Sequence, residues 1–347
     1  MIHAVLDGRH FRRIGLIGLA VLLVFSGCGK RGPEVYTREL LGTLVKISVY
    51  DNGDHVKGAV EEGFAAMQKV QDTMNRFDPG SELAALNGKA GAGWTEVSDG
   101  LLHVIRSSVR YSKETEGAFD VTVLPLMGLW DFNAEEPKAP SQTHVDAMLR
   151  LVGSDRIVVD DERKKILLPI TGMGVDLGAI AKGYAVDRAV AALERGGIGS
   201  GMVVGGGNIA FVGLPPGRPH WNIGVRHPRD KTSEVGVIHV ASGAVATSGE
   251  YEKYVILNGK RYSHIIDPKT GWPVESNVAS VSILAPTAEE ADALSTAVFV
   301  MGAKEGMKFV EAREGIEAVI ITLDAREDIK VLLSTGLKDR YTPFSPE

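Results

Sequence analysis

The stretch GMVVGGGNIAFV, residues 201–212, joins two short apolar runs through three consecutive glycines. A glycine-rich turn after a strand also opens a dinucleotide-binding βαβ unit, but a helix follows the turn in that unit. Residues 209–212 instead continue as a short apolar run that includes Ile209, Phe211 and Val212, which predicts a second strand. The stretch therefore disfavours a Rossmann fold.

Further strands surround this stretch. Residues 202–284 contain short β runs separated by Gly, Pro and Asn, and Asn258-Gly259 is a typical two-residue hairpin turn. Residues 36–50 and 156–168 also have strand character. Helices are predicted at residues 55–77, 99–112, 176–195 and 288–301, the last with Thr287 and Glu290 as a capping box. We expect an α+β fold of mixed or antiparallel sheets with flanking helices, with residues 135–140 as an exposed excursion.

Composition allows a sizeable core and excludes one class of partner. The chain has 347 residues, of which 44% are hydrophobic. Its net charge is −6, and its longest Lys/Arg run is only the three residues 163–165. Nucleic-acid binding by neutralisation of phosphates is therefore not expected.

The N-terminus resembles a bacterial lipoprotein signal. Basic residues precede an apolar run over residues 14–25, and Cys28 follows the small residues Ser26 and Gly27. The apolar segment is shorter than the ~20 residues that span a bilayer. We expect a signal peptide at 1–27, a lipid on Cys28, a linker at 28–35 and export to a membrane surface outside the cytoplasm. An uncleaved signal anchor or a plain secretory signal is the alternative.

The presence of a single cysteine restricts the chemistry. Once Cys28 is acylated, no free thiol remains for catalysis, a disulfide or a zinc site. The sequence also lacks a Walker A motif, a Gly-x-Ser-x-Gly elbow and a His-Glu-x-x-His motif.

Two patterns could bind phosphate or a cation. Asp176, Ala179 and Lys182 recur at three-residue spacing along one side of a predicted helix start, where anions bind readily. Asp292 and Thr296 are i, i+4 neighbours, and their oxygens suit Mg²⁺. Taken alone, the first pattern is better explained by a capped helix and the second by a buried Asp–Thr hydrogen bond.

Two further patterns could serve the same site. His264 follows the Asn258-Gly259 hairpin and is a possible general base, although a lone histidine is more often structural. Phe119 and Asp120, with the nearby Trp130, could stack on a heterocycle and hydrogen-bond to it, or Phe119 and Trp130 could simply pack in the core.

The order of these patterns along the chain resembles the FAD:protein FMN transferases, the ApbE-type flavin transferase family. The resemblance extends over about residues 36–340. The matching blocks are residues 41–43, 81–87, 117–120, 176–187, 205–209, 247–249, 264–271 and 291–296. It implies an ApbE-like fold with flavin in a central cleft and a catalytic domain at 36–347.

The resemblance also implies residue roles. The implied Mg²⁺ ligands are the Ala179 carbonyl, Asp292 and Thr296. The implied FAD contacts are Leu41, Ala118, Phe119, Asp120, Asp176, Lys182 and Ile266, with Leu41 standing where the family usually has Met. We expect Lys182 to stabilise the pyrophosphate and His264 to accept the proton of the acceptor hydroxyl. Asp267 or a metal-bound water are alternatives to His264.

The implied reaction moves FMN from FAD to a Thr or Ser hydroxyl of another protein and releases AMP. The implied acceptor is a flavoprotein subunit of a membrane electron-transport complex of the sodium-pumping or Rnf type. A metal-dependent FAD pyrophosphatase and a flavin-binding lipoprotein without turnover remain as alternatives. We expect that this chain itself is not flavinylated.

Overall fold

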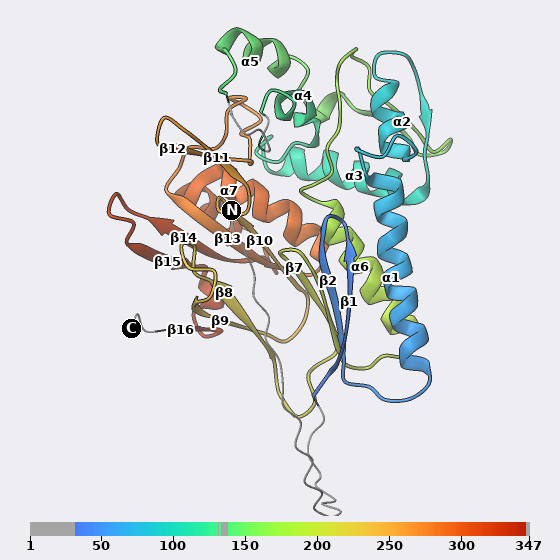
Figure 1. Cartoon of the computed structure of the whole chain (residues 1–347), viewed down its shortest axis with the longest axis vertical. Helices are drawn as coiled ribbons and strands as arrows, with labels where there is room; N and C mark the ends of the chain where they lie inside the picture. The colour runs from blue at the N-terminus through green and yellow to red at the C-terminus, as the bar shows by residue number, and fades with distance from the viewer. Residues whose placement is uncertain (1–31, 131, 133–137, 345–347) are drawn as a thin grey trace, which may run out of the picture. The chain divides into compact units, whose positions relative to one another are not determined.

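The computed structural model describes residues 32–130, 132 and 138–344 (Figure 1). The predicted signal peptide, the lipidation site Cys28 and residues 135–137 of the predicted excursion lie outside the described residues. Residues from Pro33 onward form one compact unit. Within the described part of the chain, no helix has both the length and the apolar character needed to cross a membrane.

An eight-stranded sheet with the order β1-β2-β6-β7-β10-β13-β14-β15 organises this unit. Every neighbouring pair in the sheet is antiparallel. The strands are β1 (Glu34–Leu40), β2 (Thr43–Val49), β6 (Gly201–Gly205), β7 (Asn208–Val212), β10 (Ala244–Gly249), β13 (Val278–Ala285), β14 (Glu317–Leu323) and β15 (Ile329–Leu333). The predicted α+β fold with antiparallel sheets is confirmed, and the glycine stretch indeed joins two neighbouring strands.

Different layers cover the two faces of the large sheet. Helices α1 (His55–Met74), α6 (Ala181–Arg195) and α7 (Ala288–Glu311) pack on one face. A smaller sheet of β8 (Trp221–Arg226), β9 (Glu234–Val240) and β16 (Tyr341–Pro343) packs on the other. Strand alternation explains this, because in β7 Ala210 joins the helix-side core while Phe211 joins the opposite core.

The remaining elements lie around these layers. They are α2 (Glu82–Gly88), β3 (Thr95–Glu96), α3 (Asp99–Glu114), η1 (Val121–Val123), α4 (Leu124–Met127), α5 (Gln142–Leu149), η2 (Ser154–Arg156), β4 (Val158–Asp160), β5 (Lys165–Leu167), β11 (Tyr254–Leu257), β12 (Lys260–Ser263) and η3 (Thr335–Leu337). The predicted hairpins at residues 156–168 and around Asn258-Gly259 are both present.

Two helix ends differ from the expectation, one because of a side-chain hydrogen bond to the backbone and one because of a kink at a glycine. Helix α1 ends at Met74 rather than at residue 77, because the Asn75 side chain accepts the Phe77 N–H over 3.1 Å. Helix α7 continues past residue 301 to Glu311 through a kink at Gly302, whose φ is +78°. At its start the Thr287 hydroxyl accepts the Glu290 N–H over 3.2 Å, as one half of a capping box does.

Candidate functional site

The start of α6 lies directly against α7. A Cβ atom on Gly183 would come within 2.1 Å of the Ala288 carbonyl oxygen and 2.8 Å of the Asp292 Cβ atom, so the position has no room for a side chain. This close approach allows the Gly183 N–H to donate to the Asp292 Oδ2 atom over 3.0 Å. Gly183 thus fixes a buried carboxylate of α7 at the N-terminal turn of α6.

The expectation that Asp176, Ala179 and Lys182 share one side of a helix is wrong, because α6 begins only at Ala181. The Asp176 carboxylate accepts the Gly178 N–H over 2.8 Å and holds the preceding residues in a turn. Asp176 and Ala179 therefore belong to the loop that leads into α6. In a regular helix the Gly183 N–H would bond to the Ala179 carbonyl, but here it bonds to Asp292, which leaves that carbonyl available to another partner.

Asp292, Thr296 and Lys182 come together at this junction. The Lys182 Nζ atom lies 4.0 Å from the Asp292 Oδ2 atom and also donates to the Gly178 carbonyl. The Thr296 hydroxyl lies 3.4 Å from the Asp292 carbonyl oxygen on the same helix. The Asp292 side chain is only 9% exposed, whereas Lys182 is 31% exposed. A buried carboxylate, a hydroxyl and a half-buried cation thus share one site.

Strand β10 adds the hydroxyl of Ser248, which lies in the matching block 247–249 but to which the sequence analysis assigned no role. The Ser248 Oγ atom lies 2.8 Å from the Ser295 Oγ atom and 3.2 Å from the Thr296 Oγ1 atom. The polar pair Thr247-Ser248 at the end of an apolar run was the available signal.

Strand β7 contributes a second polar group on the same face. Asn208 is 1% exposed, and its Oδ1 atom has no hydrogen-bond partner among the described residues. Asn208 pairs with Ala246 across the ladder, so its side chain and that of Ser248 point to the same face of the sheet. A buried oxygen without a partner is costly, so the helix-facing side of β7 has unmet hydrogen-bonding capacity.

A cavity of about 390 Å³ lies next to this junction. The predicted flavin contacts Leu41, Asp176 and Lys182 line it. Leu41 and Gly42 form the β1–β2 turn with positive φ values of 56° and 68°. The Gln71 side chain holds this turn by accepting the Leu41 N–H over 2.6 Å. The rest of the lining comes from Val70, Met74, Asn75, Arg76, Phe77, Leu177, Gly178 and Ala181.

Arg76 and Phe77 are lining residues that the sequence analysis missed, because residue 77 was assigned to the end of a helix. The Arg76 guanidinium forms an ion pair with Asp176 and lies 4.0 Å from the centre of the Phe77 ring. Phe77 is 76% exposed, which is unusual for an aromatic side chain beside a cavity. The cavity wall therefore offers a cation and an exposed aromatic surface.

The segment 118–120 has well-defined contacts within the protein. The Asp120 Oδ1 atom accepts the Thr122 N–H over 2.7 Å, and the Oδ2 atom accepts the Ser154 N–H over 2.8 Å. Ala118 and Phe119 are buried. None of the three residues lines the 390 Å³ cavity. Their assignment as flavin contacts stays a prediction.

His264 follows β12 directly and has a defined tautomer. Its Nδ1 atom lies 3.0 Å from the Lys253 carbonyl oxygen, which can only accept, so Nδ1 carries the proton and Nε2 has a free lone pair. Burial, together with the charges of Lys182 and Lys253, lowers the pKa of His264 below 6.5. The neighbouring Ile266 is buried and bridges to Pro273. His264 is therefore neutral at pH 7 and able to accept a proton.

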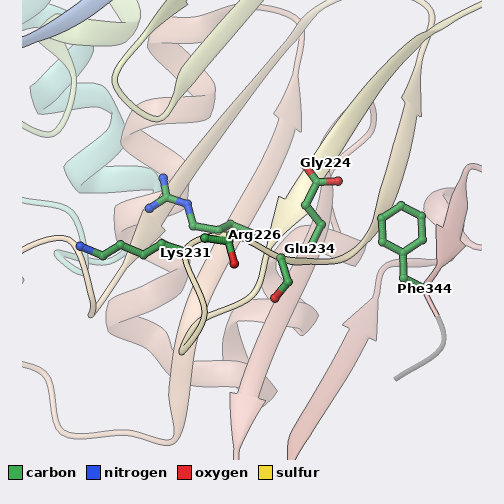
Figure 2. Close-up of a pocket in the computed structure, with 7 residues that line it drawn as sticks. Gly224, Arg226, Lys231, Glu234 and Phe344 are labelled. Atoms are coloured by element: carbon green, nitrogen blue, oxygen red, sulfur yellow. The ribbon is translucent and has the colours of Figure 1, made fainter. Parts of the chain in front are cut away.

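A second cavity, of about 450 Å³, lies at the smaller sheet (Figure 2). Arg226, Lys231, Glu234 and Phe344 are among its lining residues. Arg226 is paired with Glu252 at 3.1 Å. None of the predicted site residues lines this cavity.

Comparison with known proteins shows the family to which this chain belongs. The ApbE family model matches residues 41–320. The chain belongs to the ApbE family. An FAD:protein FMN transferase of Escherichia coli strain K12 is 31% identical to it, over 94% of this chain and 97% of the relative. The Treponema pallidum FAD:protein FMN transferase is 33% identical, over 94% of each chain.

A solved ApbE structure supports the same assignment. The flavin transferase ApbE from Vibrio cholerae superposes with a TM-score of 0.80 and 31% identity, over 89% of this chain and 99% of that chain. The ApbE-like fold expected from the sequence is thereby confirmed.

Proposed function

We propose that this chain is an FAD:protein FMN transferase that depends on Mg²⁺ and transfers FMN to a Thr or Ser hydroxyl of an acceptor protein. The observation that carries the proposal is the junction of α6 and α7, where Lys182, Asp292 and Thr296 meet beside a cavity lined by Leu41 and Asp176. Membership of the ApbE family supplies the reaction class.

The donor set at the junction fits a hard divalent cation. The Asp292 carboxylate and the Thr296 hydroxyl are oxygen donors, and the Ala179 carbonyl lacks its helical partner. On strand β7, Asn208 has a buried oxygen without a partner among the described residues. Mg²⁺ favours such oxygens. We assign Ala179, Asp292 and Thr296 as the residues that would hold the ion. When bound, Mg²⁺ would neutralise negative charge on the pyrophosphate of FAD.

The residues around the cation site have separate tasks. Lys182 lies 4.0 Å from Asp292, so its charge is close enough to the cation site to stabilise the phosphate that leaves. The cavity with its apolar and aromatic wall binds part of FAD, with Asp176 and Arg76 forming a charged pair at its edge. In this arrangement, the pyrophosphate of FAD lies between the cavity and the junction of α6 and α7.

The reaction balances with His264 as the proton acceptor. The oxygen of the acceptor hydroxyl forms a bond to the phosphorus that bears riboflavin, and the bond from that phosphorus to the bridging oxygen breaks. AMP leaves with the bridging oxygen. The hydroxyl proton passes to the free Nε2 atom of His264, whose lowered pKa keeps it neutral beforehand.

The acceptor and the location complete the proposal. Resemblance to the family points to a flavoprotein subunit of a membrane electron-transport complex as acceptor. The signal at residues 1–27 and Cys28 point to an exported enzyme that a lipid holds at a membrane. Both would bring enzyme and acceptor to the same surface.

The test uses the chain without residues 1–28, mixed with FAD, Mg²⁺ and a domain that carries a candidate acceptor threonine. Mass spectrometry should find one FMN phosphoester on the acceptor and none on the enzyme. The adduct should disappear with EDTA and in Asp292→Asn. Release of AMP without an adduct would replace the transferase with a pyrophosphatase. Intact FAD under all conditions would leave a flavin-binding protein without turnover.

A further inference from the structure

We propose that Ser248 is a positioning residue, which orients the Thr296 hydroxyl so that its oxygen lone pairs face the cation site. This inference rests on the proposed function, because it concerns the residues that would hold Mg²⁺. It assigns a task to a residue of β10 that supplies no ligand itself.

Three hydroxyl groups form a chain between β10 and α7. Ser295 is fully buried, and its Oγ atom lies 2.9 Å from the Asp292 carbonyl oxygen. Ser248 lies 2.8 Å from Ser295 and 3.2 Å from Thr296. Ser248 therefore stands between a hydroxyl bound to the backbone and a hydroxyl at the cation site.

The hydrogen of each hydroxyl follows from this geometry. The Asp292 carbonyl oxygen can only accept, so the Ser295 hydrogen points to it. Ser248 must then donate its hydrogen to Ser295. The remaining hydrogen in the chain belongs to Thr296, which donates to Ser248. The Thr296 oxygen thus directs its lone pairs away from Ser248 and keeps them free for a cation.

Without Ser248 this order is lost. The Thr296 hydroxyl would retain one acceptor, the Asp292 carbonyl oxygen at 3.4 Å, which is a longer contact. Its rotation would then be less restricted. Residues that orient metal ligands in this way change metal affinity by about 10–100-fold when they are removed.

The adjacent residue provides a matched control. The Thr247 hydroxyl bonds to the Ser282 hydroxyl over 2.8 Å, on the opposite face of the sheet. Like Ser248, Thr247 is half-buried in β10 and forms a hydroxyl pair with a neighbouring element. Thr247→Ala should therefore have a similar effect on stability with no effect on the cation site.

The experiment measures Mn²⁺ binding alone, by the loss of the electron paramagnetic resonance signal of free Mn²⁺. The variants are Ser248→Ala, Ser248→Thr and Thr247→Ala, each with its melting temperature measured in EDTA. We expect Ser248→Ala to bind Mn²⁺ about 10-fold or more weakly. Ser248→Thr, which keeps the hydroxyl, and Thr247→Ala should bind within about twofold of the wild type, well inside that range.

Each outcome decides the inference. Equal Mn²⁺ affinity of Ser248→Ala and the wild type would overturn it while leaving the proposed function intact. Equal losses in Ser248→Ala and Thr247→Ala would also overturn it, because the effect would then be structural. Should Ser248→Ala fail to fold, weak binding by folded Ser248→Thr would count against it. Absence of Mn²⁺ binding by the wild type would remove both the metal site and the inference.

Discussion

His264 is a histidine whose charge state depends on a specific neighbour. Burial lowers its pKa below 6.5, and Lys182 lowers it further. We expect the transfer rate to fall as the pH drops through this lowered pKa, because protonated Nε2 cannot accept the hydroxyl proton. Lys182→Met should raise the pKa of His264 toward 6.5, as measured from its ring proton by NMR with His264→Gln for assignment. A pKa that stays the same in Lys182→Met would show that the two side chains do not interact.

Asp292 accepts the Gly183 N–H and is also the proposed cation ligand, and two substitutions separate these roles. Asp292→Ala removes the acceptor of the buried Gly183 N–H and should lower the free energy of unfolding by about 1–3 kcal/mol. Asp292→Asn keeps an acceptor oxygen and should lose most Mn²⁺ binding and transfer activity with a smaller stability loss. Denaturant unfolding and Mn²⁺ titration of both variants check this. Full activity of Asp292→Asn would contradict the assignment as a ligand.

At the scale of elements, the contact between α6 and α7 depends on one glycine. In Gly183→Ala the added Cβ would lie 2.1 Å from a backbone oxygen, so the helices must separate. We expect a loss of about 1–3 kcal/mol in stability and a drop in activity. The control is Gly58→Ala in α1, where an added Cβ would meet no other described part of the chain within 4 Å and where the change should stabilise by about 0.5–1 kcal/mol. Thermal unfolding of both variants tests the comparison.

The start of α7 is also sensitive to pH. The Asp187 carboxylate accepts the N–H groups of Ala288 and Glu289, each over 2.8 Å. Burial nevertheless raises the pKa of Asp187 from 3.8 to about 6. The folded state therefore binds this proton more tightly, so the stability from this group is present at low pH and is lost as the pH rises toward 6. Lowering the pH from 7 to 5 should raise the melting temperature of the wild type relative to Asp187→Asn. A constant difference across that range would show that Asp187 titrates normally.

At the scale of the whole molecule, local patterns predicted the fold class better than they predicted the contacts of the site. Strand alternation and the turn at Asn258-Gly259 depend on neighbouring residues, so the antiparallel α+β fold followed from the sequence. Helix ends at Met74 and Ala181 did not, because side-chain hydrogen bonds of Asn75 and Asp176 displaced them.

In the site, too, features within one helix could be predicted from the sequence, whereas contacts between distant residues could not. The spacing of Asp292 and Thr296 is visible within one helix. The Gly183–Asp292 bond joins residues 109 positions apart, and the Ser248–Thr296 contact joins residues 48 apart. Spacing along a chain does not predict such contacts, so the position of Arg76 at the cavity and the contact of Ser248 with Thr296 are visible only in the fold.

The length of strand β1 bears on how far the cavity could lie from a membrane to which Cys28 is anchored. Strand β1 begins at Glu34 and ends beside the turn that lines the cavity, which places that turn ~24 Å along the strand from its start. On the lipid-anchor proposal, residues 28–33 add at most ~20 Å of extended chain. On the same proposal, the cavity lies no more than ~45 Å from the membrane surface. Confinement to the layer within that distance raises the local concentration of acceptors whose threonines project into it, and leaves taller domains out of range.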